Sequence, residues 1–269
     1  MHKITFLCFG ALAAVALMIA LFALWLTTFP SDGKQLTIQL SRGPLTVLDF
    51  PSKKPGTAAL ILFASGDGGW GGLEEAIGHA FQNQGYEAIG IDSEAYAQSD
   101  YDLDTLQTDF SIMARKAQAH FGTHPPPLIV GGYSMGAAQA IAVAGGPHPP
   151  SGLIGLLLAD PCSRGRYGLR TSDQMNVLPT GPGTFSVDSF SKTMDSLRVV
   201  QWHAANDPID SRSWLDSLTA QHKEFTFPNA GHGYDTDRDD FIHQLVESAG
   251  WILNPSSDGA VATKVKISP

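Results

Sequence analysis

Apolar and polar residues alternate in two short segments near the start of the globular part of the chain. QLTIQLS and PLTVLDF place apolar residues at every second position, and Arg42 and Gly43 separate them. Period-two alternation is typical of strands with one buried face, and a short separator containing glycine favours a hairpin. We therefore predict an antiparallel strand pair over residues 35–50.

Continuous apolar runs and segments of helical spacing then follow one another. Short apolar runs without alternation are typical of strands that are buried on both faces of a parallel sheet. We expect such strands at 57–64, 86–92, 128–134, 152–160, 197–204 and 223–228, and helices at 70–84, 103–121, 135–144, 211–221 and 237–253. Residues 93–102 are expected to form a loop, and residues 161–196 an excursion over one face. This order predicts an α/β fold with a mostly parallel central sheet flanked by helices.

An uncharged apolar run covers Ile4 to Phe29, before the first predicted strand. A signal-peptide core is about 7–15 residues long, whereas a bilayer span needs about 20. Because the run is long enough to span and no A-x-A site follows, we predict an N-terminal transmembrane signal anchor at 1–29; a cleaved signal peptide is the alternative. Lys3 before the run favours a cytoplasmic N-terminus, which places the rest of the chain outside the cytoplasm. The predicted organisation continues with a linker at 30–34, the α/β domain at 35–253 and a disordered tail at 254–269.

The charge and the cysteines exclude several classes of function. The formal net charge is −9, which disfavours binding to nucleic acid. Cys8 lies in the apolar run, so Cys162 has no partner for a disulfide within the globular domain and is expected in the core. No H-E-x-x-H, paired cysteines or Walker A motif occurs, and we predict no metal and no cofactor.

The glycine-rich segment SGDGGW, residues 65–70, is open to two interpretations. Gly66, Gly68 and Gly71 fit the dinucleotide-binding pattern G-x-G-x-x-G, and Asp92 follows where a ribose-binding acid would lie. That interpretation predicts a nicotinamide-dependent oxidoreductase. However, two strand-like segments precede the strand that leads into this loop, and Trp70 is bulky where a pyrophosphate would approach. The alternative is a loop that stabilises an oxyanion.

The segment GYSMG, residues 132–136, matches G-x-S-x-G between an apolar strand and a helix of small residues. This context is that of a nucleophile elbow, a tight turn that holds a serine exposed at the start of a helix. We therefore predict that Ser134 is a nucleophile. Glycines flank such a serine because the strained turn and the close helix packing leave no room for a Cβ.

A serine nucleophile needs a basic residue and an acid that orients it, and in this type of fold they follow in the order serine, acid, histidine. His232, in NAGHGY before the last helix, is the predicted base. Asp207, just past the strand LRVVQWHA, is the predicted acid, and Asp160, which also ends a strand, is the alternative. Asp210 is expected to cap the helix that begins at Ser211, and His203 to be structural.

Two backbone N–H groups are needed for an oxyanion hole. The first is expected from Met135, the residue after the nucleophile. The second is expected from the SGDGGW loop, at either Asp67 or Gly68. In this arrangement Ser134 would attack a carbonyl whose developing charge points toward those groups.

FASGDGGW, GIDS and GGYSMGA occur in this order along the chain, and together they resemble the bacterial virulence protein family VirJ and the C-terminal domain of AcvB. The later AGHGYD resembles the histidine motif of that family, with Gly233 where a second histidine is usual. The resemblance extends from about Ala58 to Leu253 by motif order, although residues 161–196 have no counterpart and the segment around Asp207 is a loose match. It implies an α/β-hydrolase fold on the periplasmic side of the inner membrane.

The resemblance also implies an activity. Members similar to AcvB release the amino acid from aminoacyl-phosphatidylglycerol, typically lysyl-phosphatidylglycerol, so the expected partners are the membrane and a phospholipid headgroup. Carried onto this chain, Ser134, His232 and Asp207 would hydrolyse the aminoacyl ester, and Asp67 would face the ammonium group. Acidic residues on neighbouring loops agree with a cationic ligand: Asp92, Glu94, Asp100 and Asp102. Some members are linked instead to secretion, which leaves two alternatives: a general carboxylesterase, or a non-enzymatic partner of secretion-system proteins.

Overall fold

The computed structural model describes residues 33–175, 177–209, 212–254 and 263–266 of the chain. The predicted anchor at 1–29 lies outside the described residues, as does most of the linker at 30–34. Within the described ranges, no helix combines the length and the apolar character needed to cross a bilayer. Gly33–Pro269 form one compact unit.

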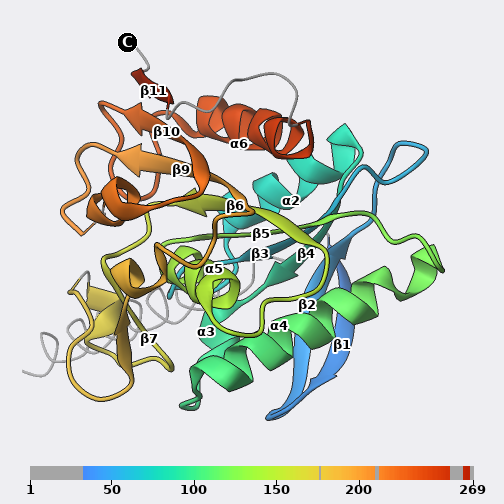
Figure 1. The fold of residues 1–269 in the computed structure, drawn as a ribbon, viewed down its shortest axis with the longest axis horizontal. Coiled ribbons are helices and arrows are strands. Elements are labelled where there is room, and N and C mark those ends of the chain that lie inside the picture. The colour runs from blue at the N-terminus through green and yellow to red at the C-terminus, as the bar shows by residue number, and fades with distance from the viewer. Residues whose placement is uncertain (1–32, 176, 210–211, 255–262, 267–269) are drawn as a thin grey trace, which may run out of the picture. The chain divides into compact units, whose positions relative to one another are not determined.

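One nine-stranded sheet runs through the described residues, in the order β1-β2-β4-β3-β5-β6-β9-β10-β11 (Figure 1). Its strands are β1 (Lys34–Leu40), β2 (Gly43–Phe50), β3 (Leu60–Ala64), β4 (Glu87–Ile91), β5 (Leu128–Tyr133), β6 (Leu153–Ala159), β9 (Arg198–Ala204), β10 (Gln221–Phe227) and β11 (Thr263–Lys266). β1 and β2 form the predicted hairpin, and β2 runs antiparallel to β4. The other neighbouring strands are parallel. The prediction of a mostly parallel sheet is therefore confirmed.

Helices cover both faces of this sheet (Figure 1). They are α2 (Gly72–Gln84), α3 (Ser93–Tyr96), α4 (Leu103–Gln118), α5 (Met135–Gly145) and α6 (Arg238–Leu253), with 3-10 turns η1 (Ala119–Phe121), η2 (Asp173–Met175), η3 (Val187–Phe190) and η4 (Ser213–Ser217). Alternate residues of β3 enter separate cores: Leu62 packs with α4 and α5, whereas Phe63 packs with α2 and α6. Each central strand is thus buried on both faces, which explains its continuous apolar sequence.

The expected excursion at 161–196 contains a small second sheet. β7 (Arg164–Arg166) pairs antiparallel with β8 (Thr184–Ser186), and η2 lies in the loop between them. Figure 1 shows this segment to one side of the main sheet, beyond α5. The excursion therefore adds a structure outside the main sheet.

Three local predictions differ from the structure. In the described part of the helix expected at 211–221, the structure has only the short turn η4, and Gln221 already belongs to β10, where it pairs with Arg198 of β9. The loop expected at 93–102 begins with α3, which is capped by the Asp92 side chain. The predicted disorder of 254–269 is wrong at Thr263–Lys266, which pair in parallel with β10. Without β11, the backbone groups on that edge of β10 would lack strand partners.

Candidate active site

Ser134 lies in a strained turn between β5 and α5. Its φ is 54° and its ψ is −115°, a conformation that residues with a Cβ rarely adopt. A Cβ on Gly132 would collide with the backbone of Gly136, and a Cβ on Gly136 would collide with the carbonyl oxygen of Ala64. The flanking glycines are thus required by close packing of α5 against β3 and β5, and the turn has the geometry of a nucleophile elbow.

The structure brings the three predicted triad residues together. His232 Nε2 lies 3.0 Å from Ser134 Oγ, and His232 Nδ1 lies 2.6 Å from Asp207 Oδ2. Asp207 follows β9 and His232 follows β10, so the two strands carry these side chains to the edge of the sheet where β5 delivers Ser134. The Asp207 side chain is 1% exposed, which shields its bond to His232 from water.

Asp160, the alternative acid, also lies close to His232. It ends β6 with a φ of 44°, is fully buried, and accepts a hydrogen bond from Ala204 N at 2.8 Å. Asp207 accepts a further bond at 3.0 Å from Ile209 N, which orients its carboxylate toward the imidazole. The geometry therefore assigns Asp207 to the hydrogen bond with His232 and Asp160 to the end of β9.

Ligand atoms of Asp160, Asp207 and His232 all lie within 4.8 Å of one another, close enough to hold a metal ion in principle. Both ring nitrogens of His232 already have hydrogen-bond partners, Asp207 and Ser134. A metal would have to displace one of these bonds. The arrangement therefore fits a proton relay better than a metal centre.

The environment of His232 favours its protonated form. Burial lowers the pKa of the imidazole, but the hydrogen bond and the charge of Asp207, together with the charges of Asp160 and Asp67, outweigh that effect. The net result is a pKa raised above the ordinary 6.5. A histidine in this setting is a strong acceptor for a serine proton, because the imidazolium that forms is stabilised by the nearby carboxylates.

Tyr133, the second residue of GYSMG, is a site residue that the sequence did not identify. Its hydroxyl donates a 2.7 Å hydrogen bond to the backbone carbonyl of His232, and the two rings lie 4.9 Å apart. It thus joins the end of β5 to the histidine loop. The variable position of the motif was the only signal that the sequence offered, and it does not by itself indicate a contact 99 residues away.

The SGDGGW loop lies beside Ser134, as predicted for an oxyanion loop. Gly69 has a φ of 80°, and its N–H donates to Gly66 O at 3.2 Å, which closes a tight turn. The Trp70 ring packs against Gly90 and stacks with Phe50, away from the turn. The loop is therefore fixed at its tryptophan end while its glycine end faces the serine.

Met135, Asp67 and Ser134 line one pocket, while Gly68 is exposed on the loop. Burial raises the pKa of Asp67, and hydrogen bonds from its own N–H and that of Gly68, with the charge of His232, act against that rise. The two candidate amides are those of Asp67 and Gly68. Which of them is the second oxyanion donor stays a prediction.

Three of the other acidic residues expected near the ligand have structural partners, and Glu94 is not among the residues that line the pocket. Asp92 caps α3 by accepting from Ala95 N, and Asp102 caps α4 by accepting from Thr105 N. Asp100 forms an ion pair with an arginine of the excursion. Asp67 is thus the member of that predicted set that lines the pocket.

The excursion supplies the opposite wall of this narrow pocket, whose volume is about 40 Å³. The residues it contributes are Cys162, Arg164, Gly165, Arg166, Asp173, Val177 and Pro179, and Ile209 completes the lining. The sequence predicted Cys162 as a core residue, and it is indeed buried. The others were missed, because an irregular segment carries no periodicity that would place its side chains.

Residues 58–144 match a model of a known protein family. The match is to the bacterial virulence protein family VirJ. The VirJ segment contains both the SGDGGW loop and Ser134, which confirms the resemblance over this part of the chain. Asp207 and His232 lie beyond the VirJ match, so their placement rests on the structure. A search of curated proteins found no match.

Solved structures similar to this chain are hydrolase folds of low sequence identity. The esterase domain of a Rhodothermus marinus protein is 17% identical with a TM-score of 0.61, covering 82% of this chain and 97% of its own. Est1E from Butyrivibrio proteoclasticus is 15% identical with a TM-score of 0.60, covering 82% and 99%. A serine hydrolase without lid from Xanthomonas campestris is 18% identical with a TM-score of 0.59, covering 83% and 96%. The chain therefore has the α/β-hydrolase fold that the VirJ resemblance implies.

Proposed function

We propose that the protein is a serine hydrolase that cleaves the aminoacyl ester of aminoacyl-phosphatidylglycerol. The observation that carries the proposal is the continuous relay from Ser134 Oγ through His232 to Asp207. A serine, a histidine and an aspartate that are far apart in sequence and are linked in this order by hydrogen bonds form the arrangement used for acyl transfer. The esterases among the similar folds and the VirJ match support the same class of reaction.

In the proposed mechanism, His232 Nε2 accepts the Ser134 hydroxyl proton as Oγ attacks the aminoacyl carbonyl carbon. Asp207 keeps Nδ1 protonated and stabilises the imidazolium. The carbonyl oxygen becomes an oxyanion that the Met135 N–H and the SGDGGW loop stabilise. His232 then returns the proton to the glycerol oxygen, and phosphatidylglycerol leaves.

The aminoacyl group is now esterified to Ser134. Water attacks this ester while His232 accepts one proton from it, and collapse of the second intermediate returns that proton to Ser134 Oγ. The products are the free amino acid and the restored enzyme. No cofactor takes part in these steps.

The pocket carries side chains of both charge signs, which supports a substrate of both signs. Asp67 lines it with a carboxylate and Arg164 with a guanidinium group, while Arg166 and Asp173, which also line it, are paired with each other. Lysyl-phosphatidylglycerol presents an ammonium group and an anionic phosphate a few bonds from its ester. In this proposal Asp67 faces the ammonium group, and the exposed Arg164 faces the phosphate.

The proposed location follows from the same substrate. Residues 1–29 anchor the domain on the periplasmic side of the inner membrane, where it meets the phospholipid headgroup. Secretion-system proteins are partners under the non-enzymatic alternative. A general carboxylesterase of another substrate would have the same triad but no dependence on Asp67.

Activity-based labelling tests the chemistry. A fluorophosphonate probe should label the full chain covalently, and labelling should disappear in Ser134→Ala while the variant keeps its thermal stability.

Lipid mass spectrometry should show accumulation of the aminoacyl lipid in cells that lack the protein or carry Ser134→Ala. Labelling without any lipid change would leave a general esterase, and full rescue of a deletion phenotype by Ser134→Ala would support the non-enzymatic alternative.

A further inference from the structure

Three large apolar side chains are exposed together at the tip of the excursion. Met175 is 72% exposed, Val177 56% and Leu178 36%, and they are the exposed large hydrophobic residues of the part of the chain that the structure describes. Scattered exposed apolar residues are ordinary, but a group confined to one loop indicates a contact surface. We call these three residues the apolar tip.

The apolar tip adjoins the candidate active site. Val177 lines the pocket that contains Ser134, and the neighbouring Pro179 lines it too. Gln174, just before Met175, donates a hydrogen bond from Nε2 to Asp67 O at 3.1 Å. The tip is therefore continuous with the pocket wall on one side and bonded to the predicted oxyanion loop on the other.

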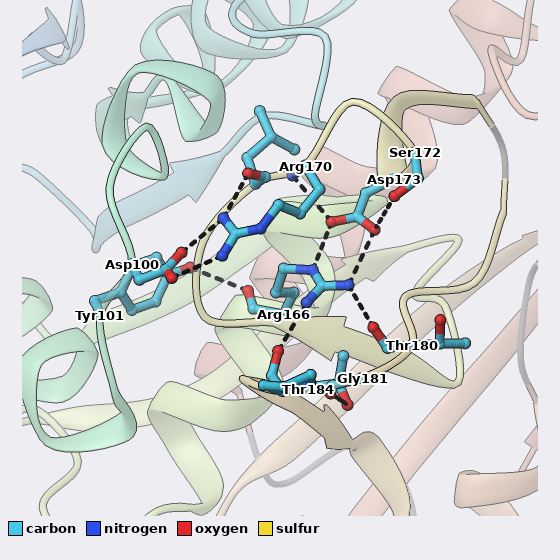
Figure 2. A network of polar contacts seen from close by, with 11 residues as sticks. Asp100, Tyr101, Arg166, Arg170, Ser172, Asp173, Thr180, Gly181 and Thr184 are labelled. Atoms are coloured by element: carbon cyan, nitrogen blue, oxygen red, sulfur yellow. Dashed lines mark hydrogen bonds and ion pairs between the residues drawn. The ribbon is translucent and has the colours of Figure 1, made fainter.

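The base of the tip is held by a buried ion pair (Figure 2). Arg166 Nε lies 2.7 Å from Asp173 Oδ2, and both side chains are 8% exposed. The same guanidinium donates at 2.8 Å to the carbonyls of Thr180 and Pro182, on the returning arm of the loop. Arg166 thus joins the two arms, so exposure of the tip results from a defined loop structure.

We propose that the apolar tip inserts into a lipid surface and so brings a lipid-borne ester to Ser134. A stable protein interface buries about 800 Å² on each partner, which three loop side chains do not provide. A bilayer sets no such minimum, because each inserted CH₂ contributes separately. Arg164, exposed on the same pocket wall, adds a positive charge where lipid phosphates would lie.

The first experiment compares hydrolysis of a lipid-borne ester with hydrolysis of a soluble ester, and it rests on the proposed function. The full chain is reconstituted in vesicles of phosphatidylcholine and phosphatidylglycerol, with lysyl-phosphatidylglycerol as lipid-borne ester and p-nitrophenyl acetate as soluble ester. Met175→Ser with Leu178→Ser should lower hydrolysis of the lipid ester about tenfold and leave the soluble ester within about twofold. Val177 stays unchanged, because it lines the pocket. The matched control, Met175→Leu with Leu178→Met, keeps the tip apolar and should retain both activities.

Equal loss on both esters would overturn the inference, because the tip would then only support the pocket. Unchanged hydrolysis of the lipid ester would also overturn it. If the wild-type chain cleaves neither ester, the proposed function fails, and the contact is tested by the arm below.

A second arm measures lipid contact without catalysis. In a Cys8→Ser background, Leu178→Cys is labelled with an environment-sensitive fluorophore, Cys162 being buried. Thr123→Cys is the control, because Thr123 is exposed before β5, at the opposite end of that strand from Ser134. Lipids brominated on their acyl chains should quench the label at position 178 and leave the label at 123 unquenched. Equal quenching at both positions, or none at 178, would overturn the inference.

Discussion

Asp207 and Asp160 both lie close to His232, but they act on it in different ways. Asp207 makes the 2.6 Å hydrogen bond to Nδ1, whereas Asp160 raises the pKa of His232 through its charge and accepts from Ala204 N. Removing the Asp207 carboxylate should therefore change both the orientation of His232 and the charge beside it. Removing the Asp160 carboxylate should change only the charge near His232. This difference can be measured at the level of single residues.

We predict a distinct pH profile for each acid variant. The pKa of His232 is raised above 6.5, so the imidazole becomes protonated at a higher pH than an ordinary histidine when the pH falls. Because only the neutral imidazole can accept the serine proton, kcat/KM should fall as the pH drops through that pKa. Asp207→Asn should lower kcat/KM by about 10⁴-fold and move this limb to lower pH. Asp160→Asn should move the limb in the same direction with a loss of about tenfold or less.

The measurement is kcat/KM for a soluble ester at a series of pH values from about 5 to about 9, a range that spans the ordinary histidine pKa. A larger loss in Asp160→Asn than in Asp207→Asn would reverse the assignment of the acid. The same shift has a consequence for stability: the contribution of His232 is fully present below pH 6.5 and is lost as the pH rises through its folded pKa.

Tyr133 gives a second prediction at this scale. Tyr133→Phe removes the hydroxyl that donates to His232 O but keeps the ring beside the imidazole. The loss of about 1 kcal/mol of hydrogen bonding should loosen the histidine loop and lower kcat several-fold. KM should stay nearly constant, because Tyr133 positions His232 without touching substrate. Steady-state kinetics separate the two constants, and a change confined to KM would contradict this role.

At the scale of elements, the turn from β5 to α5 depends on close packing that only glycine allows. A Cβ at Gly136 would collide with the carbonyl oxygen of Ala64 in β3, so α5 could not keep its distance from the sheet. The helix would have to shift, and Ser134, the residue just before its first turn, would shift with it. Fold stability and active-site geometry are coupled at this element.

Gly136→Ala should therefore destabilise the domain by about 1–3 kcal/mol, as overpacking does. Gly68→Ala is a matched control, because nothing lies within 4 Å of a Cβ at that position. Its free energy of unfolding should change by about 0.5 kcal/mol or less. Chemical denaturation of both variants gives the comparison, and equal stability of the two would contradict the packing argument.

At the scale of the whole molecule, the sheet order explains how distant segments build one site. β5, β6, β9 and β10 are consecutive neighbours in the sheet and run parallel, so their carboxyl ends meet at one edge. Ser134, Asp160, Asp207 and His232 each follow one of these strands. This is the edge at which ligands bind in open α/β sheets.

Export of the whole chain is a prediction at this scale. β-Lactamase fused after Pro269 should confer ampicillin resistance on the host cell, because the apolar run from Ile4 to Phe29 directs the domain out of the cytoplasm. Deleting residues 1–29 should abolish that resistance. Fractionation then separates the anchor from a cleaved signal peptide, since the anchored fusion sediments with membranes. Resistance that survives the deletion would contradict the predicted role of the segment.

The sequence by itself determined the strand and helix pattern, the elbow at Ser134 and the candidates Asp207 and His232, since these depend on local periodicity and on motif order. Tertiary structure decided which acid reaches His232, because Asp160 and Asp207 both end strands and differ only in where their side chains point. It also decided the length of the segment at 211–221, through pairing of β10 with β9, and the partners of Asp92 and Asp100. The pocket wall and the apolar tip emerged only from the fold, because an irregular loop is positioned by long-range contacts such as Arg166 with Asp173 and Gln174 with Asp67.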